Sequence, residues 1–308
     1  MRTELCFSVV AIALLVHGTH DRQGKSMQRR IEQAASEYAG VMGIAARNLL
    51  TGEEIAVNAD ARFPTASTIK TAVMIEAYHQ AAEAKLSLES RIALKDADKV
   101  GGSGVLNGMS AGLELTVKDL IHLMITLSDN TATNMLVTRL GAKQIDDRME
   151  GYGLRETKIF RPTFRDGQPD VFPELEREFG LGMTTPKEMM RLMALIAEGK
   201  AVSADASAEM LKTLQRQQDR AMIPRLLPAG LEVGNKTGTD AEKLADASGR
   251  RGAIRADAAI VTGPGVKYVI AIYTRRGADP GYGIDNAALL AGARISRLVY
   301  DGFTAKAQ

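Results

Sequence analysis

Cysteine occurs only once in this 308-residue chain, at Cys6, and histidine only four times. One cysteine cannot form a disulfide within the chain, and no HExxH or similar ligand spacing is present. We therefore expect neither a disulfide-stapled domain nor a metallohydrolase, and we expect no metal ion or cofactor. The formal net charge is only +2, without a basic run, so the composition gives no indication of a nucleic-acid partner.

Long apolar runs are equally scarce. Residues 5–16 form an apolar stretch behind Arg2 that is too short to span a bilayer and is placed like the hydrophobic region of a signal peptide. We predict a signal peptide over residues 1–20, with a disordered apolar start as the alternative. No later segment is long and apolar enough to cross a membrane. The expected product is exported, periplasmic or extracellular, with no stable membrane insertion after processing.

Three short motifs occur once each and in order: Ser67-Thr68-Ile69-Lys70, Ser128-Asp129-Asn130 and Lys236-Thr237-Gly238. The first alone is expected about once in a chain of this length, whereas the ordered trio should arise by chance in roughly one chain per thousand. A serine hydroxyl is a weak nucleophile that must pass its proton to a base as it attacks. Ser67 and Lys70 would leave the same face of a helix, so the pattern predicts a serine nucleophile with a lysine base.

The other motif residues supply the remaining parts of an acyl transfer from an amide. Lysine acts as a base only if its pKa falls well below about 10.4, through burial or a nearby cation, and Lys236 is the obvious second cation. Ser128 can relay a proton to the leaving nitrogen. Asn130 can hold Lys70 and a substrate amide, and Thr237 can form a hydrogen bond to a substrate carboxylate.

This set resembles the penicillin-recognising serine hydrolases, and the aspartate in Ser128-Asp129-Asn130 resembles the class A β-lactamases. The similarity covers residues 25–303. It implies an α/β (α+β) fold of the β-lactamase and transpeptidase type, in which an antiparallel sheet is flanked by helices and an all-helical region is inserted. It also implies an oxyanion hole formed by the N–H groups of Ser67 and Thr239. Gly238 would let a ligand approach the strand closely.

A further cation for the substrate carboxylate is expected from the resemblance. Arg255 is placed like the arginine that some class A enzymes use, and its planar guanidinium could bind a carboxylate through two hydrogen bonds. Arg275 and Arg276 are competitors for this role.

The chain departs from the family pattern between Arg161 and Thr185, the 161–185 segment. Class A β-lactamases carry a glutamate there that activates the water for release of the acyl group. The nearest match here is Val171-Phe172-Pro173-Glu174-Leu175-Glu176, with Phe172 in place of that glutamate. Glu174 is our first candidate for a replacement base, and the other carboxylates of the segment are alternatives: Asp166, Asp170, Glu176 and Glu178.

Apolar periodicity, caps and turn residues predict the order of elements. Helices are expected at 27–38, 66–85, 116–128, 131–140, 185–199, 205–217 and 285–300, and strands at 41–48, 53–58, 231–237, 256–262 and 266–274. The sheet region would then comprise 21–63 and 218–308, the helical region 64–217, and the active site their junction.

Three functions are compatible with these features. The leading one is a β-lactamase that is acylated at Ser67 and hydrolyses the ester. The second is a D-Ala-D-Ala peptidase, an esterase or a slowly deacylating penicillin-binding protein. The third is a binding protein for β-lactams or peptidoglycan, which would have no need of Lys70. In each case the partner is a small β-lactam or a peptidoglycan-like molecule, and we expect a monomer.

Overall fold

The computed structural model describes residues 26–305, so the predicted signal peptide lies outside the described residues. A five-stranded sheet forms its centre, with the order β2-β1-β10-β9-β8, and every pairing in it is antiparallel. Its strands come from both ends of the chain: β1 Val41–Asn48, β2 Glu54–Val57, β8 Glu232–Ala241, β9 Ala253–Gly263 and β10 Val266–Gly277. The strand β8 is therefore one edge of the sheet.

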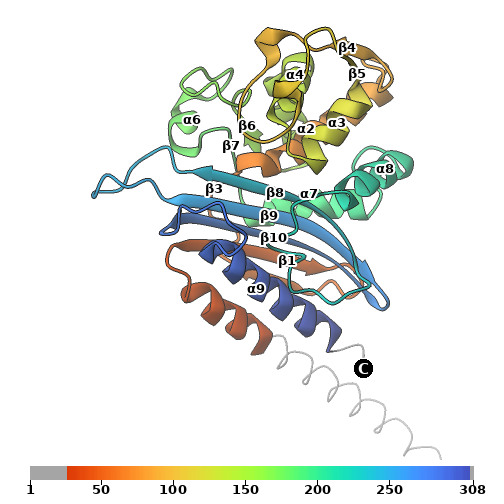
Figure 1. The fold of residues 1–308 in the computed structure, drawn as a ribbon. Helices are drawn as coiled ribbons and strands as arrows, with labels where there is room; N and C mark the ends of the chain where they lie inside the picture. The colour runs from red at the N-terminus through yellow and green to blue at the C-terminus, as the bar shows by residue number, and fades with distance from the viewer. Residues whose placement is uncertain (1–25, 306–308) are drawn as a thin grey trace, which may run out of the picture.

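The two faces of the sheet are covered by different layers (Figure 1). A helix over residues 26–36 and helix α9, Ala287–Thr304, cover one face. On β10, Tyr268, Ile270 and Ile272 face this layer, whereas Val269, Ala271 and Tyr273 belong to the core under the helical region. Because successive strand residues point to opposite faces, burial on both sides explains why the strand is almost continuously apolar.

The helical region lies on the other face and is inserted between β2 and β8 (Figure 1). Helix α7, Pro186–Ala197, packs against the sheet. The other elements of this region are β3 Phe63–Pro64, η1 Ala66–Ile69, α2 Lys70–Ala82, β4 Arg91–Ala93, η2 Asp96–Asp98, η3 Leu106–Gly108, β5 Glu114–Thr116, α3 Val117–Thr126, α4 Asn130–Leu140, α5 Ala142–Gly151, β6 Lys158–Ile159, α6 Pro173–Phe179, β7 Gly182–Thr184 and α8 Ala204–Gln215. The fold class expected from the resemblance is confirmed.

Local signals set several boundaries that matter for the site. Thr116 and Asp119 form a capping box at the start of α3, with hydrogen bonds of 3.0 Å in both directions. Asp129 caps α4 by accepting a hydrogen bond from the N–H of Ala132. Ser67, which was expected in the first turn of an α-helix, lies instead in the 3-10 turn η1 before α2. Between residues 26 and 305, no helix is long and apolar enough to cross a membrane.

Candidate active site

The first motif approaches the edge of the sheet more closely than a side chain would permit. A Cβ atom on Gly238 would lie 2.9 Å from the carbonyl oxygen of Thr65 and 3.2 Å from the backbone nitrogen of Ser67. Residue 238 is thus glycine because η1 rests on β8 at this point, whereas the sequence suggested room for a ligand. This contact fixes Ser67 beside the Lys236-Thr237-Gly238 strand.

Lys70 connects the first motif with the second. Its Nζ atom donates to the carbonyl oxygen of Ser128 at 2.8 Å, to Ser128 Oγ at 3.1 Å and to Asn130 Oδ1 at 2.8 Å. The side chain is fully buried. As a neutral amine, Lys70 can satisfy the carbonyl and amide oxygens with two N–H groups, which leaves its lone pair for a hydroxyl proton. It then has the form that a general base needs.

The Ser128 hydroxyl lies between two lysines. Lys236 Nζ donates to Ser128 Oγ at 3.1 Å and to its neighbour's carbonyl, that of Thr237, at 2.9 Å. Ser128 itself has a left-handed backbone, with φ of +55°. Such a conformation is uncommon for a residue other than glycine and persists only where its surroundings impose it. Ser128 is therefore held where it can pass a proton to or from Lys70.

Burial shifts the pKa values of both lysines downward. For Lys70 the pKa falls well below its ordinary value, mainly because burial disfavours the charged form and also because of the positive charge of Lys236; the negative charge of Asp129 opposes this. Burial lowers the pKa of Lys236 to about 8, against the charges of Asp219 and Asp257. The downward shift favours the neutral form of Lys70, whereas a pKa of about 8 leaves Lys236 largely charged at neutral pH.

Asp129 fastens the second motif to the loop over residues 101–106. Its Oδ2 atom accepts hydrogen bonds from the N–H groups of Val105 at 2.6 Å and Leu106 at 2.9 Å, while Oδ1 accepts from Ala132. Asn130 adds two bonds to the same loop, from its backbone N–H to Ser103 O and from Nδ2 to Gly101 O. This loop is therefore part of the support for Asn130.

A cleft of about 220 Å³ opens beside these groups. Members of all three motifs line it, namely Ser67, Ser128 and Thr237, together with Thr239. The other lining residues are Ser103, Thr126, Leu127, Gln217, Gln218 and Asp219. Within residues 26–305, no group of three or more potential ligands could hold a metal ion. Buried Lys70 and Lys236 do not line the cleft themselves, but both contact the Ser128 hydroxyl that does.

Comparison with known proteins agrees with this arrangement. Residues 26–303 match the model of the β-lactamase enzyme family. The chain belongs to that family. It is 31% identical to the solved β-lactamase of Sphaerobacter thermophilus, with a TM-score of 0.76 over 91% of this chain and 98% of that one. It is 27% identical to PBP-A, also with a TM-score of 0.76, over 91% and 96% of the two chains. The curated β-lactamase CARB-4 of Pseudomonas aeruginosa is 25% identical and aligns with 77% of this chain and 80% of its own.

Family and fold together identify a serine β-lactamase-like hydrolase. A second solved structure of PBP-A, of a mutant, is an acyl-enzyme complex with penicillin G and is 27% identical to this chain. Relatives of both kinds thus share the fold of this β-lactamase family member.

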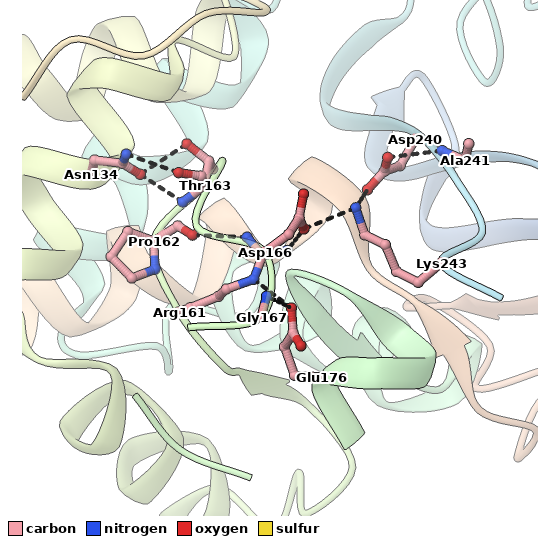
Figure 2. A network of polar contacts seen from close by, with 10 residues as sticks. All are labelled: Asn134, Arg161, Pro162, Thr163, Asp166, Gly167, Glu176, Asp240, Ala241 and Lys243. Carbon is pink, nitrogen blue, oxygen red and sulfur yellow. Dashed lines mark hydrogen bonds and ion pairs between the residues drawn. The ribbon is translucent and has the colours of Figure 1, made fainter. Parts of the chain in front are cut away.

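The 161–185 segment contacts helix α4 of the site through Thr163 (Figure 2). The sequence had suggested Glu174 as the residue of this segment that acts at the site. Asn134 of α4 accepts hydrogen bonds from Thr163 N at 2.7 Å and Thr163 Oγ1 at 2.8 Å, and donates to Thr163 O at 3.1 Å. Thr163 Oγ1 also lies 3.4 Å from Asn130 O. Thr163 is therefore the residue that α4 holds beside the second motif. Asn134 follows Asn130 by one helical turn, so the sequence could have indicated Asn134, although not its partner Thr163.

Phe172 and Glu174 lie elsewhere. The ring of Phe172 packs edge-on against Phe160 at 6.3 Å, with Lys158 Nζ 4.7 Å from its centroid. Glu174 is exposed in the first turn of α6 and forms no hydrogen bond or ion pair within the described residues. The alignment that put Phe172 at the position of the family glutamate is not supported by this geometry.

Of the other carboxylates of the segment, Asp166 and Glu176 pair within the segment, Glu178 pairs outside it, and the exposed Asp170 side chain forms no hydrogen bond or ion pair within the described residues. Buried Arg161 pairs with Glu176 at 2.8 Å and also with Asp166. Glu178 pairs with Arg275 at 3.5 Å. Among residues 26–305, none of the side chains that line the cleft comes from the 161–185 segment; the only carboxylate there belongs to Asp219.

Arg255 lies opposite Thr239 in the β8–β9 pairing. Its guanidinium group, however, forms hydrogen bonds to backbone carbonyl oxygens. Nη1 donates to the carbonyl oxygens of Ile254 at 2.8 Å and Asp240 at 3.3 Å, and Nη2 donates to Pro280 and Gly281. The side chain is only 2% exposed. Arg255 would have to exchange these bonds to bind a substrate carboxylate.

The two competing arginines lie at the end of β10. Arg275 is paired with Glu242 at 2.9 Å, and Arg276 is exposed with a left-handed backbone. The sequence-based choice among the three arginines stays a prediction.

Proposed function

We propose that Ser67 is acylated by β-lactams and that the resulting ester is released slowly. The observation that carries the acylation step is the position of the Ser128 hydroxyl, 3.1 Å from both Lys70 Nζ and Lys236 Nζ. Support for slow release comes from the 161–185 segment, which presents Thr163 and no free carboxylate to α4. This favours a penicillin-binding enzyme over a rapid β-lactamase.

The acylation step follows from the charges of the site. Neutral Lys70 takes the proton of Ser67 as Oγ attacks the lactam carbonyl carbon. The N–H groups of Ser67 and Thr239 stabilise the negative oxygen that forms. As the C–N bond breaks, the proton passes from Lys70 through the Ser128 hydroxyl to the leaving nitrogen, which regenerates neutral Lys70. Lys236 and Thr237 hold the substrate carboxylate.

Peptides or esters that end in D-Ala-D-Ala are the second candidate substrates. They have the amide and the terminal carboxylate that the same groups would hold. The likeness to PBP-A over 91% of this chain favours this candidate. Export, which the N-terminal apolar stretch predicts, and a monomeric state belong to the same proposal.

The test restores a carboxylate where α4 holds the segment. In Thr163→Glu we expect release of the acyl group to become faster, within the range of about 100-fold to 10,000-fold that general base catalysis supplies. Thr163→Gln is the matched control, because it has nearly the same shape without a base. Loss of the benzylpenicillin adduct is followed by intact-protein mass spectrometry. Equal release rates in the two variants would contradict our inference that residue 163 occupies the position from which a general base acts. An adduct on Ser67→Ala would overturn the assignment of Ser67 as the nucleophile.

A further inference from the structure

Asp219 is a carboxylate of the cleft to which the proposed mechanism gives no role. Among residues 26–305 it is the only acidic residue that lines the cleft beside Ser67, and it is exposed. A substrate that acylates Ser67 has to occupy this cleft, so the charge of Asp219 acts on that substrate. The role that we infer for Asp219 therefore rests on the proposed function.

The backbone of Asp219 is fixed from two sides. Its carbonyl oxygen accepts a hydrogen bond from Asn235 Nδ2 at 3.2 Å, and its N–H donates to Gln217 Oε1 at 3.0 Å. Gln217 in turn donates from Nε2 to the carbonyl oxygen of Ile125 at 2.7 Å. Asn235 and Gln217 are both buried. Asp219 is thus held between strand β8, through Asn235, and helix α3, through Gln217.

The carboxylate group of Asp219 has one oxygen left for a ligand. Oδ1 accepts a hydrogen bond from the N–H of Ala221 at 3.1 Å, whereas Oδ2 accepts none within the described residues. No lysine or arginine between residues 26 and 305 forms an ion pair with Asp219, and the adjacent Arg220 is exposed. An ionised carboxylate with a free oxygen can form an ion pair with a cation of the substrate.

Asp219 lies at the leaving-group end of the substrate. In the proposed mechanism the reacting carbonyl lies at Thr239, and the substrate carboxylate lies at Thr237 and Lys236. Asn235, which binds Asp219, is the next residue of β8 beyond Lys236. Burial lowers the pKa of Lys236, and the negative charge of Asp219 is the largest effect that opposes this shift, so the two charges lie near each other. A group attached beside the substrate carboxylate therefore meets Asp219.

A second carboxylate near Lys236 is not accessible to a substrate. Asp257 on β9 is fully buried and does not line the cleft. Its Oδ1 atom accepts from Asn235 Nδ2 at 3.0 Å, and its Oδ2 atom accepts from the N–H of Ile223 at 3.0 Å. Of the two carboxylates, only Asp219 can contact a substrate cation.

We propose that Asp219 makes the site prefer substrates that carry a positive charge beside the carboxylate, at the leaving-group end. Lys236 binds the carboxylate and Asp219 binds the cation, so the two protein charges match a zwitterionic leaving side. A substrate with the carboxylate alone is disfavoured, because the charge of Asp219 repels it. In a peptide, the preferred leaving residue is a diamino acid. In a cephalosporin, the preferred group is a cation on C3′, because C3 adjoins the carbon that bears the carboxylate.

The experiment compares two cephalosporins with the same acyl substituent. Cephaloridine carries a pyridinium group on C3′, and cephalothin carries a neutral acetoxy group there. With the protein in excess over the antibiotic, the loss of β-lactam absorbance gives each acylation rate, whether the ester is then released slowly or rapidly. The result is the ratio of the two rates, cephaloridine over cephalothin. The intrinsic reactivities of the two compounds cancel when this ratio is compared between variants.

In Asp219→Asn we expect the ratio to fall about twofold to fivefold, the range that loss of an exposed ion pair allows. Asparagine keeps an acceptor for the N–H of Ala221, so the loop should retain its structure. High NaCl should lower the ratio in the unchanged protein and have less effect in Asp219→Asn, because dissolved salt screens exposed charges.

Asp240→Asn is the matched control, because it removes a negative charge from the other end of β8, beyond Thr239 (Figure 2). The side chain of Asp240 is 36% exposed. If Asp219 acts by contact with the cation, Asp240→Asn should leave the ratio unchanged. A general effect of the protein's net charge would lower the ratio in both variants, because cephaloridine is zwitterionic and cephalothin is an anion.

The outcomes distinguish the role of Asp219 from the proposed function. If both cephalosporins react and the ratio in Asp219→Asn equals that of the unchanged protein, the preference for a cation is overturned and the acylation chemistry stands. An equal fall in Asp240→Asn would also overturn it. If neither cephalosporin reacts with the unchanged protein, the proposed function fails, and the role of Asp219 fails with it.

Discussion

Substitution of Asp129 by asparagine separates the structural from the electrostatic role of the second motif. The carboxylate is buried and accepts three backbone hydrogen bonds, two from the 101–106 loop and one from Ala132. The amide oxygen of asparagine can keep two of these, but its NH₂ group then faces the third N–H. One buried donor is left without an acceptor.

The stability cost can be worked out from these contacts. An unsatisfied buried donor costs about 1–3 kcal/mol, and hydrogen bonds to a neutral acceptor are roughly half as strong as those to a charged one. Together these give a loss of about 2–4 kcal/mol in the free energy of unfolding.

The electrostatic effect of the substitution, unlike its effect on stability, favours the neutral form of Lys70 that acts as the base. The negative charge of Asp129 raises the pKa of Lys70, against burial and Lys236. Without that charge the pKa of Lys70 falls further, so Lys70 stays neutral to lower pH. Acylation requires neutral Lys70 and is lost as the pH falls through its pKa. The acid side of the acylation profile should therefore move to lower pH in Asp129→Asn, although the protein is less stable.

The assay combines urea unfolding with acylation rates between pH 4 and 8. Asp119→Asn is the control: it damages the capping box of α3, where Asp119 accepts from Thr116 N at 3.0 Å, and should lower stability without moving the profile. An acid limb that moves to higher pH, or that stays in place in Asp129→Asn, would refute the account of Lys70 as the base.

Two further predictions concern strand β8, which carries Lys236-Thr237-Gly238. Gly238→Ala should lower the acylation rate more than about tenfold, because the new methyl group would lie 2.9 Å from Thr65 O and push η1 and Ser67 away from β8. The rate is measured by adduct formation, and a rate within twofold of the unchanged protein would contradict this prediction. Acylation should also decline as the pH rises above about 8, where Lys236 loses its charge; a constant rate to pH 9.5 in the same assay would show that this charge is not needed.

Much of the fold could be predicted because its signals are local. β1 begins and ends at the predicted residues, Val41 and Asn48, and the caps of α3 and α7 lie at Thr116 and Thr185 as expected. Helix α6 was missed because it has only seven residues, too few for a clear apolar period. The 3-10 turn at Ser67 depends on contact with β8, which no local pattern reports.

In the site, too, local sequence patterns predicted some residues, whereas others depend on the tertiary fold. Motif spacing indicated Ser67, Lys70, Ser128, Asn130 and Lys236, and the structure brings Lys70, Ser128, Asn130 and Lys236 within hydrogen-bond distance in one connected network. The position of Thr163 could not be read in this way, because it depends on the fold of the 161–185 segment onto α4. The short match around Phe172 pointed instead to a residue that packs against Phe160.

The most direct test of the central claim is intact-protein mass spectrometry of the purified chain with excess chromogenic cephalosporin, recorded together with absorbance. The account predicts a burst of about one equivalent and a lasting adduct on Ser67, with no adduct in Ser67→Ala. Continuous rapid hydrolysis with little adduct would contradict slow release, and a lasting adduct in Ser67→Ala would contradict the nucleophile itself.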